Sequence, residues 1–177
     1  QGNEYVLFGD YQVCFQVYAD LYNIDSNHMP ITAGEKSHPH AYKIARAIEV
    51  MEYEMSTPNN DYWWWSDGLY MVMPVMTKLY NITHNPLYLT KLYEYWSYAN
   101  SIMYDTETGL YYRDAKYVYP KHKSVNGKKD FWARGDGWVL AAFAKVLADL
   151  PKDDIHRNEY LQFYQKQAAA VAACQQP

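Results

Sequence analysis

The sequence has few of the features that mark redox, metal-binding or membrane proteins. It contains two cysteines, Cys14 and Cys174, which lie far apart in apolar helical patterns and show neither metal-ligand spacing nor a disulfide framework. No apolar run approaches the length of a membrane span, and the amino-terminal residues lack the basic-then-apolar order of a signal peptide. We therefore expect no metal site and no membrane contact. The cysteines leave both the cytoplasm and the periplasm open as the compartment.

An excess of one charge is also missing. With 16 basic and 20 acidic residues, the net charge is −4 and the pI is about 5.8. No global positive field is therefore available to hold a polyanion. We expect no nucleic-acid partner, and an anionic ligand would have to be held by local groups.

Phenylalanine is scarce, but the other aromatic residues are abundant. Five Phe stand beside 20 Tyr and 6 Trp, and aromatic residues make up 18% of the 177 positions. Tyr and Trp rings carry a polar tip, which suits wet, concave surfaces and especially those that bind sugars. Amphipathic helices also place Tyr at their half-buried margins, so the composition favours a carbohydrate ligand without requiring one.

Apolar residues recur at helical spacing in six segments, which predicts an all-helical fold. The segments cover residues 13–21, 44–55, 69–80, 89–103, 139–147 and 155–171. Asn85 and Pro86, between the third and fourth segments, are typical of an N-cap followed by a first-turn proline. Residues 109–119, followed by a basic loop that contains Asn126 and Gly127, instead predict a β-hairpin excursion.

An internal repeat becomes visible when the first, third and fifth segments are aligned. Asp10, Asp67 and Asp136 each precede a similar run of apolar residues, at spacings of 57 and 69 residues. One helix pair with its loops has this length, so the pattern is typical of stacked αα-hairpins in a solenoid or a closed toroid. Each aspartate also fits the simpler role of a helix N-cap or a first-turn charge.

Three stacked hairpins would leave apolar faces uncovered at both ends of the stack. We therefore interpret residues 1–177 as a single partial α/α-barrel domain, about half of a ring that six such hairpins would close. A complete ring would need roughly 350–400 residues at this repeat length.

The strongest local motif is the segment of residues 61–71, in which Trp63, Trp64 and Trp65 lead into Asp67 at a helix start. Indole rings exclude water, and a carboxyl group beside them is harder to ionise, although a helix N-terminus favours its charged form. Such a group can stay protonated near neutral pH. Asp67 is therefore the best candidate for a catalytic acid.

A second motif covers residues 131–138, FWARGDGW. Its two glycines let the backbone approach a ligand closely, its tryptophans offer stacking faces for a sugar, and Arg134 presents a planar fork that fits a carboxylate. The same glycines also suit an ordinary helix-start turn, and Arg134 also suits a solvated surface.

Together the two motifs resemble those of the unsaturated rhamnogalacturonyl hydrolases, glycoside hydrolase family 105, and more distantly the unsaturated glucuronyl hydrolases of family 88. The family motifs are a Trp-Trp-x-Asp-x-Leu helix start and a Trp-x-Arg-Gly-Asn-Gly-Trp turn, and the resemblance covers nearly the whole chain in register. It implies a six-hairpin α/α barrel, of which this chain would hold about three hairpins. The missing half would supply further walls of the substrate site.

The resemblance also implies roles for particular residues. Asp67 would be the general acid and base. The subsite for an unsaturated uronate would be lined by Trp65, Trp132, Arg134 and Trp138.

Three positions depart from the family pattern. Arg113 stands where the family often has His, and Asp136 stands where Asn is common. Asp10 resembles the second residue of an Asp-Asp segment that contributes another active-site carboxylate, but Gly9 replaces the first. Arg113 and Asp10 are therefore weaker candidates for substrate binding than the tryptophans.

The implied function is removal of an unsaturated uronic acid from pectin-derived oligosaccharides, by hydration of its C4=C5 double bond with one acid and no cofactor. An unsaturated glucuronyl hydrolase is the closest alternative. An ordinary glycosidase would need two carboxylates, which Asp67 could form with Asp10 or Asp136. From another class, a non-catalytic sugar-binding module would use the tryptophans to stack on sugars and the aspartates only to begin helices.

Overall fold

The computed structural model describes residues 7–24 and 40–175, and the regular secondary structure of these residues is helical. The helices are α1 (Gly9–Gln12), α2 (Cys14–Ile24), α3 (Ala41–Ser56), α4 (Ser66–Thr83), α5 (Leu87–Met103), α6 (Ala133–Asp149) and α7 (Arg157–Ala173). All six predicted helical segments are confirmed, and the first is interrupted at Val13. Helix α5 begins one residue later than predicted, because its N-cap position is Pro86 and not Asn85; the side chain of Asn85 still accepts a hydrogen bond from the Leu87 N–H at 3.0 Å.

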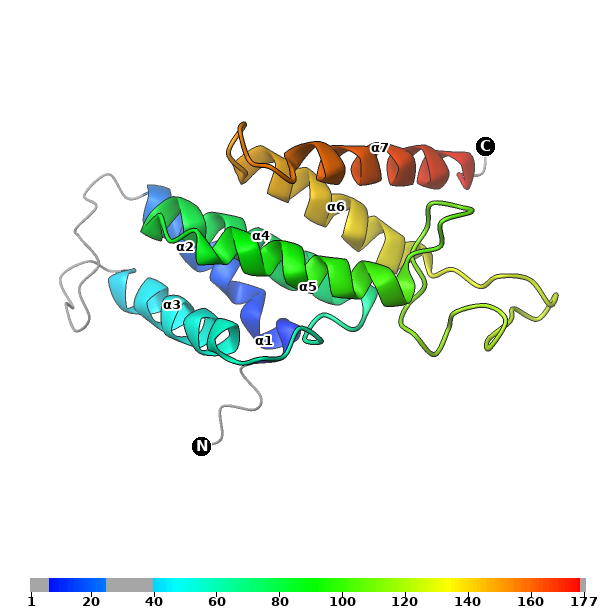
Figure 1. The fold of residues 1–177 in the computed structure, drawn as a ribbon, viewed down its shortest axis with the longest axis horizontal. Helices are drawn as coiled ribbons and strands as arrows, with labels where there is room; N and C mark the ends of the chain where they lie inside the picture. Colours follow the sequence, from blue (N-terminus) through cyan, green and yellow to red (C-terminus); the bar gives the residue numbers. More distant parts are fainter. Residues whose placement is uncertain (1–6, 25–39, 176–177) are drawn as a thin grey trace.

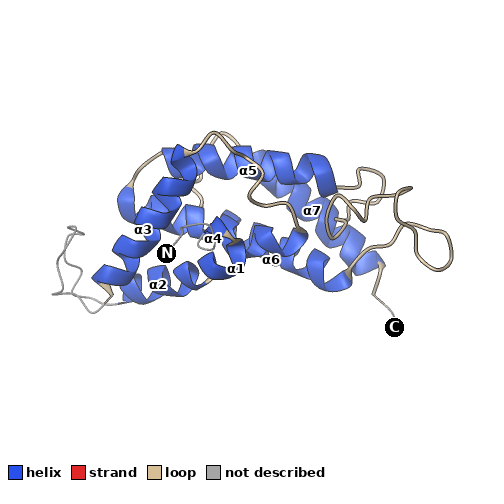
Figure 2. Ribbon diagram, turned by 90° about the horizontal axis from the view of Figure 1, so that it is seen from below, coloured by secondary structure: helices blue, strands red, loops and turns tan. Residues whose placement is uncertain are grey.

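The helices pack in pairs, as the repeat predicted. Helices α2, α4 and α6 contact each other in that order, and each also contacts the helix that follows it, α3, α5 or α7. Figure 1 shows the paired helices with a long loop, residues 104–132, projecting beyond them at the end where α6 begins. Figure 2 shows α2, α1 and α6 along one edge of the molecule and α3 and α5 along the opposite edge.

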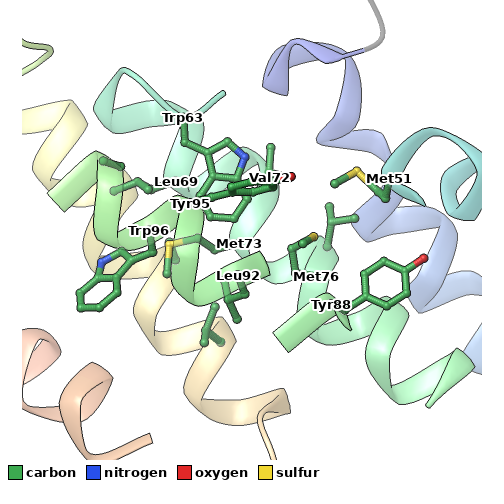
Figure 3. Close-up of a cluster of buried hydrophobic side chains, with 14 of the residues drawn as sticks. Met51, Trp63, Leu69, Val72, Met73, Met76, Tyr88, Leu92, Tyr95 and Trp96 are labelled. Carbon is green, nitrogen blue, oxygen red and sulfur yellow. The ribbon is translucent and has the colours of Figure 1, made fainter. Parts of the chain in front are cut away.

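Helix α4 lies at the centre of the core because it is apolar on several sides. Its fully buried side chains meet Met51 of α3 and Leu92 of α5 in one hydrophobic cluster (Figure 3). Full burial of each such side chain contributes about 1.5–3 kcal/mol to folding. The buried apolar residues of α4 are Leu69, Val72, Met73, Val75, Met76 and Leu79.

A proline inside α4 leaves a backbone carbonyl free for a polar contact with the neighbouring helices α2 and α6. Pro74 has no N–H, so the carbonyl of Tyr70 loses its usual donor within the helix. The side chain of Gln16 on α2 donates to this carbonyl at 2.7 Å and to that of Met71 at 3.1 Å. Lys145 on α6 in turn donates to the Gln16 amide oxygen at 2.7 Å. The side chains of Gln16 and Lys145 thus connect α2 with α4 and α6 at the position where α4 lacks a backbone hydrogen bond.

The predicted β-hairpin over residues 109–119 is wrong. Within the described ranges, pairing of strand type is limited to two isolated bridges, Tyr104 with Tyr111 and Trp65 with Asp114. A tight turn follows α5. In this turn Gly109 has a positive φ of 81°, and its N–H donates to the carbonyl of Asp105 at 2.8 Å instead of to a neighbouring strand. Further along, the chain bonds to the start of α4 instead of to a neighbouring strand.

Candidate active site

The starts of α1, α4 and α6 lie close together, and glycines make their close approach possible. A Cβ atom on Gly9 would lie 3.2 Å from a ring carbon of Trp65, and one on Gly135 would lie 2.5 Å from Ser66 Oγ. The first turn of each helix carries one of the repeated acidic residues, Asp10, Asp67 or Asp136.

The repeat also includes an aromatic residue that the sequence interpretation missed. The N-cap positions of the three helices are Phe8, Trp65 and Trp132, and none of them makes a side-chain cap hydrogen bond. The predicted N-cap role of the aspartates is therefore wrong. Their predicted position as charges in the first helical turn is confirmed. Phe8 stacks on Trp65 with ring centroids 4.6 Å apart. Aromatic rings thus surround the acidic helix starts.

The three consecutive tryptophans before α4 have different surroundings. Trp63 is 1% exposed and packs edge-on against Tyr95 in the core, with ring centroids 5.2 Å apart. Trp65 is 6% exposed because Phe8 and Gly9 cover it. Trp64 is 41% exposed and offers an open ring face next to Trp65. The accessible ring of the cluster is therefore Trp64, which sequence reasoning had not singled out.

Asp67 is half-buried, and its electrostatic surroundings favour the protonated form. Burial is the largest cause and raises the pKa of its carboxyl group, and the negative charge of Asp10 raises it further. The positive charges of Arg134 and Arg113 act in the opposite direction without cancelling the effect. The group is thus tuned toward a neutral acid while cations able to stabilise its conjugate base lie nearby.

The second motif forms an aromatic and cationic surface next to this acid. Arg134 is exposed, and its guanidinium lies over the ring of Trp132 at 4.1 Å from the centroid, which holds its planar fork in a defined orientation. Trp138 packs against Tyr70 of α4 with ring centroids 4.3 Å apart. Lys145 lies over the Tyr70 ring at 5.2 Å. Tyr70 is a second aromatic residue that sequence reasoning missed.

Arg113 joins the long loop to the start of α4. Its carbonyl accepts a hydrogen bond from the Ser66 N–H at 2.9 Å, and its guanidinium forms an ion pair with the buried carboxylate of Asp114. Its charge contributes to lowering the pKa of Asp67. The structure therefore places Arg113 beside the candidate acid, with its own charge largely balanced by Asp114.

Asp136 is enclosed within the protein. Its carboxylate accepts a hydrogen bond from the Tyr111 N–H at 2.8 Å and one from the Gln167 amide at 3.4 Å, and burial raises its pKa to about 6. It ties α6 to the loop after α5 and to α7. Asp10, by contrast, is exposed at the start of α1. Of the two possible carboxylate partners for Asp67, the structure favours Asp10.

The described parts of the chain contain neither a cluster of metal-binding side chains nor a membrane-spanning helix. No three His, Cys, Asp or Glu side chains gather there as a metal site would require. Across residues 7–24 and 40–175, no helix has the length and apolar character needed to cross a membrane.

Comparison with known proteins identifies relatives of this helical arrangement. A curated relative, the unsaturated 3S-rhamnoglycuronyl hydrolase of Formosa agariphila, is 35% identical over 117 residues, covering 64% of this chain and 31% of that protein. A solved family 88 glycosyl hydrolase from Bacteroides vulgatus is 62% identical, with a TM-score of 0.89 over 98% of this chain and 46% of its own. Another solved structure, described as a polysaccharide lyase, is 71% identical with a TM-score of 0.87, over 98% of this chain and 45% of its own.

The relation to family 105 is visible in the fold. A family 105 glycoside hydrolase from C. acetobutylicum is 20% identical and has a TM-score of 0.73, with 96% of this chain matching 48% of that one. The chain thus spans less than half the length of the relatives it matches, and its helix pairs have the α/α toroid arrangement. The sequence profile of the family described as Glycosyl Hydrolase Family 88 matches residues 1–177. The chain therefore belongs to glycosyl hydrolase family 88, with family 105 as its structural neighbour.

Proposed function

We propose that the full-length protein carrying this chain is a glycoside hydrolase that removes an unsaturated uronic acid from the non-reducing end of oligosaccharides. Pectin-derived rhamnogalacturonan fragments are the substrate class indicated by the family motifs. The proposal rests mainly on Asp67, a half-buried carboxyl group whose pKa is raised at a helix start that is lined by aromatic rings and flanked by Arg134. The Formosa relative is by name an unsaturated 3S-rhamnoglycuronyl hydrolase, which supports an unsaturated uronic acid as the sugar removed.

The proposed reaction needs only one acid. Protonated Asp67 donates its proton to C4 of the C4=C5 double bond, and the ring oxygen stabilises the positive charge that develops at C5. Asp67, now a carboxylate, accepts a proton from the water that adds at C5. The resulting hemiketal opens to a ketone at C5, and the hemiacetal left at C1 expels the neighbouring sugar as an alcohol. No bond at the anomeric carbon is broken until the double bond has been hydrated.

The surrounding residues have supporting roles in this proposal. The guanidinium of Arg134 binds the uronate carboxylate through paired hydrogen bonds, while Trp132 fixes the plane of that guanidinium by stacking. Trp65 forms the buried wall behind the acid, and Trp138 a partly exposed wall supported by Tyr70. Residues 1–177 supply about three helix pairs of one ring-shaped domain, and the rest of the protein completes the substrate site.

Substitution of the acid tests the proposal directly. Asp67→Asn keeps the size and shape of the side chain, but an amide cannot protonate C4. We expect kcat of the full-length protein to fall by at least about 10²-fold, the usual share of general acid–base catalysis, while substrate still binds. Asp61→Asn, which changes an exposed carboxylate in the same segment, is the matched control and is expected to leave kcat unchanged. The assay follows loss of the ultraviolet absorbance of an unsaturated galacturonyl-rhamnose disaccharide.

A saturated disaccharide separates this mechanism from its main alternative. Asp10 lies near enough to raise the pKa of Asp67, so the two carboxylates could also act as the pair of an ordinary glycosidase. Hydration predicts no cleavage of the saturated compound. Equal cleavage of both compounds would reject hydration and favour the two-carboxylate mechanism, and normal turnover by Asp67→Asn would remove Asp67 from catalysis.

A further inference from the structure

Helix α1 is a short segment that brings two groups to the candidate site. Phe8, its N-cap residue, stacks on Trp65, and Asp10, in its first turn, carries a charge that raises the pKa of Asp67. The helix has only four residues and is separated from α2 by Val13. Such a short helix is not stable by itself, so its place is decided by contacts with the rest of the protein.

A fully buried hydrogen bond connects the end of α1 with α3. Gln12, the last residue of α1, and Glu54 of α3 are both 0% exposed. The Gln12 amide donates to Glu54 Oε2 at 2.5 Å, although the two residues are 42 positions apart in the chain. Water cannot reach either group, so a displacement of α1 would break this bond without replacing it by a bond to solvent. The bond therefore favours one place for α1.

The same end of α3 also holds the segment that leads to the tryptophans. The Thr57 hydroxyl donates to the Glu54 carbonyl at 2.9 Å and lies 2.6 Å from the Tyr62 hydroxyl. Tyr95 of α5 donates to the same carbonyl at 3.3 Å, and its ring packs edge-on against Trp63 (Figure 3). Glu54 therefore contacts α1 through its side chain and, through Thr57, the segment that precedes α4.

We infer that Glu54 is a positioning residue for the candidate acid: its bond to Gln12 holds α1, and with it Asp10, at the start of α4. Glu54 is enclosed in the protein and acts on Asp67 through α1. The inference rests on the proposed function, because Asp67 is the acid of that reaction. It gives a role in catalysis to α3, a helix that neither sequence motif includes.

The expected effect on the acid has a definite sign. Asp10 on α1 raises the pKa of Asp67, whereas Arg134 of α6 and Arg113 of the long loop lower it. A displacement of α1 would weaken the influence of Asp10 and leave the two arginines in place. The pKa of Asp67 should then fall, so this carboxyl group should lose its proton at lower pH.

The test measures the pH–rate profile of the full-length protein with an unsaturated galacturonyl-rhamnose disaccharide. Glu54→Met fills a similar space without the hydrogen bond, and its alkaline limb should move to lower pH while kcat on the acidic plateau changes little. Gln12→Met breaks the same bond from the α1 side and should give the same shift, so the result does not depend on one variant. Glu54→Gln, whose side-chain oxygen still accepts from Gln12, should keep the limb in place. Glu52→Met, at an exposed position of α3, is the matched control.

Asp10→Asn separates positioning from a general loss of stability. In the Asp10→Asn protein the charge that α1 brings to Asp67 is already absent, so adding Glu54→Met should shift the limb less than it does in the parent. A variant that only lowers stability would instead reduce kcat across the profile without moving the limb. Equal shifts in both backgrounds, or an unshifted limb in Glu54→Met, would overturn the inference.

A direct titration keeps this inference separate from the proposed chemistry. Carbon NMR of the full-length protein labelled at its aspartate carboxyl groups, with Asp67→Asn to assign the resonance, reports the pKa of Asp67 without any substrate. A lower pKa in Glu54→Met and an unchanged pKa in Glu54→Gln would support the positioning role even when no unsaturated uronide is turned over, a result that would reject the proposed function. An unchanged pKa of Asp67 in Glu54→Met would reject the positioning role, whatever the turnover.

Discussion

Glu54 gives the sharpest prediction about stability, because a buried carboxyl group on α3 has only a neutral partner. The Gln12 amide on α1 donates to Glu54 Oε2 at 2.5 Å, and burial raises the pKa of Glu54 to about 7. The other side-chain oxygens of both residues, Oε1 in each, are buried without a hydrogen-bond partner. A proton on Glu54 would let it donate to Gln12 Oε1, so the geometry also favours the neutral form.

The sign and size of the effect follow from linkage. The pKa of Glu54 in the folded protein, about 7, is above its ordinary value of 4.5. Its favourable contribution to stability is therefore fully present below about pH 4.5 and is lost as the pH rises through about 7. A shift of this size corresponds to about 3 kcal/mol, most of it between about pH 5 and pH 8. Asp136, with a pKa raised to about 6, adds a loss of the same sign over a lower range.

Glu54→Gln should remove the part of this pH-dependent loss of stability that comes from Glu54. The new amide can still accept from the Gln12 amide group and can donate to Gln12 Oε1, so little change is expected near pH 5. Near pH 8, the free energy of unfolding of the full-length protein should rise by about 2–3 kcal/mol, as measured by urea denaturation at both pH values. Glu52→Gln, at an exposed position on the same helix, is the control. An unchanged pH slope in Glu54→Gln would show that Glu54 is not held neutral.

Two further predictions concern the helix starts. Gly135→Ala places a methyl group 2.5 Å from Ser66 Oγ of α4 and should lower the free energy of unfolding by about 1–3 kcal/mol in urea denaturation. The methyl group of Gly137→Ala would meet nothing within 4 Å, so this variant should be neutral or slightly stabilised. Equal effects of the two substitutions would contradict the close contact at Gly135. Asp10→Asn removes a charge that raises the pKa of Asp67, so the alkaline limb of the pH–rate profile should move to lower pH, and Arg134→Gln should move it to higher pH. Shifts in the same direction would contradict the assignment of Asp67 as the acid.

Much of the fold could be predicted from the sequence because it depends on local periodicity. Apolar residues at helical spacing located the six predicted helical segments, and the recurrence of Asp10, Asp67 and Asp136 indicated that alternate segments are equivalent. The tryptophans before Asp67 predicted that this carboxyl group is shielded from water and therefore harder to ionise. In the structure, burial does raise the pKa of Asp67. These inferences use interactions between residues a few positions apart.

The sequence could not distinguish residues whose roles depend on distant partners. Trp63, Trp64 and Trp65 are chemically identical, and only their packing against Tyr95, solvent and Phe8 separates a core residue from an exposed ring and a buried wall.

The same limit explains the wrong β-hairpin and the overlooked Glu54. Residues 109–119 have the composition of strands, but the Arg113 carbonyl bonds to Ser66 at the start of α4. Glu54 follows Glu52 on the same helix, and only the tertiary structure buries Glu54 next to Gln12 of α1 and leaves Glu52 in solvent. Local patterns therefore determined the helices and the candidate acid, whereas burial and hydrogen bonding, which depend on residues far apart in the chain, decided the surroundings of each side chain.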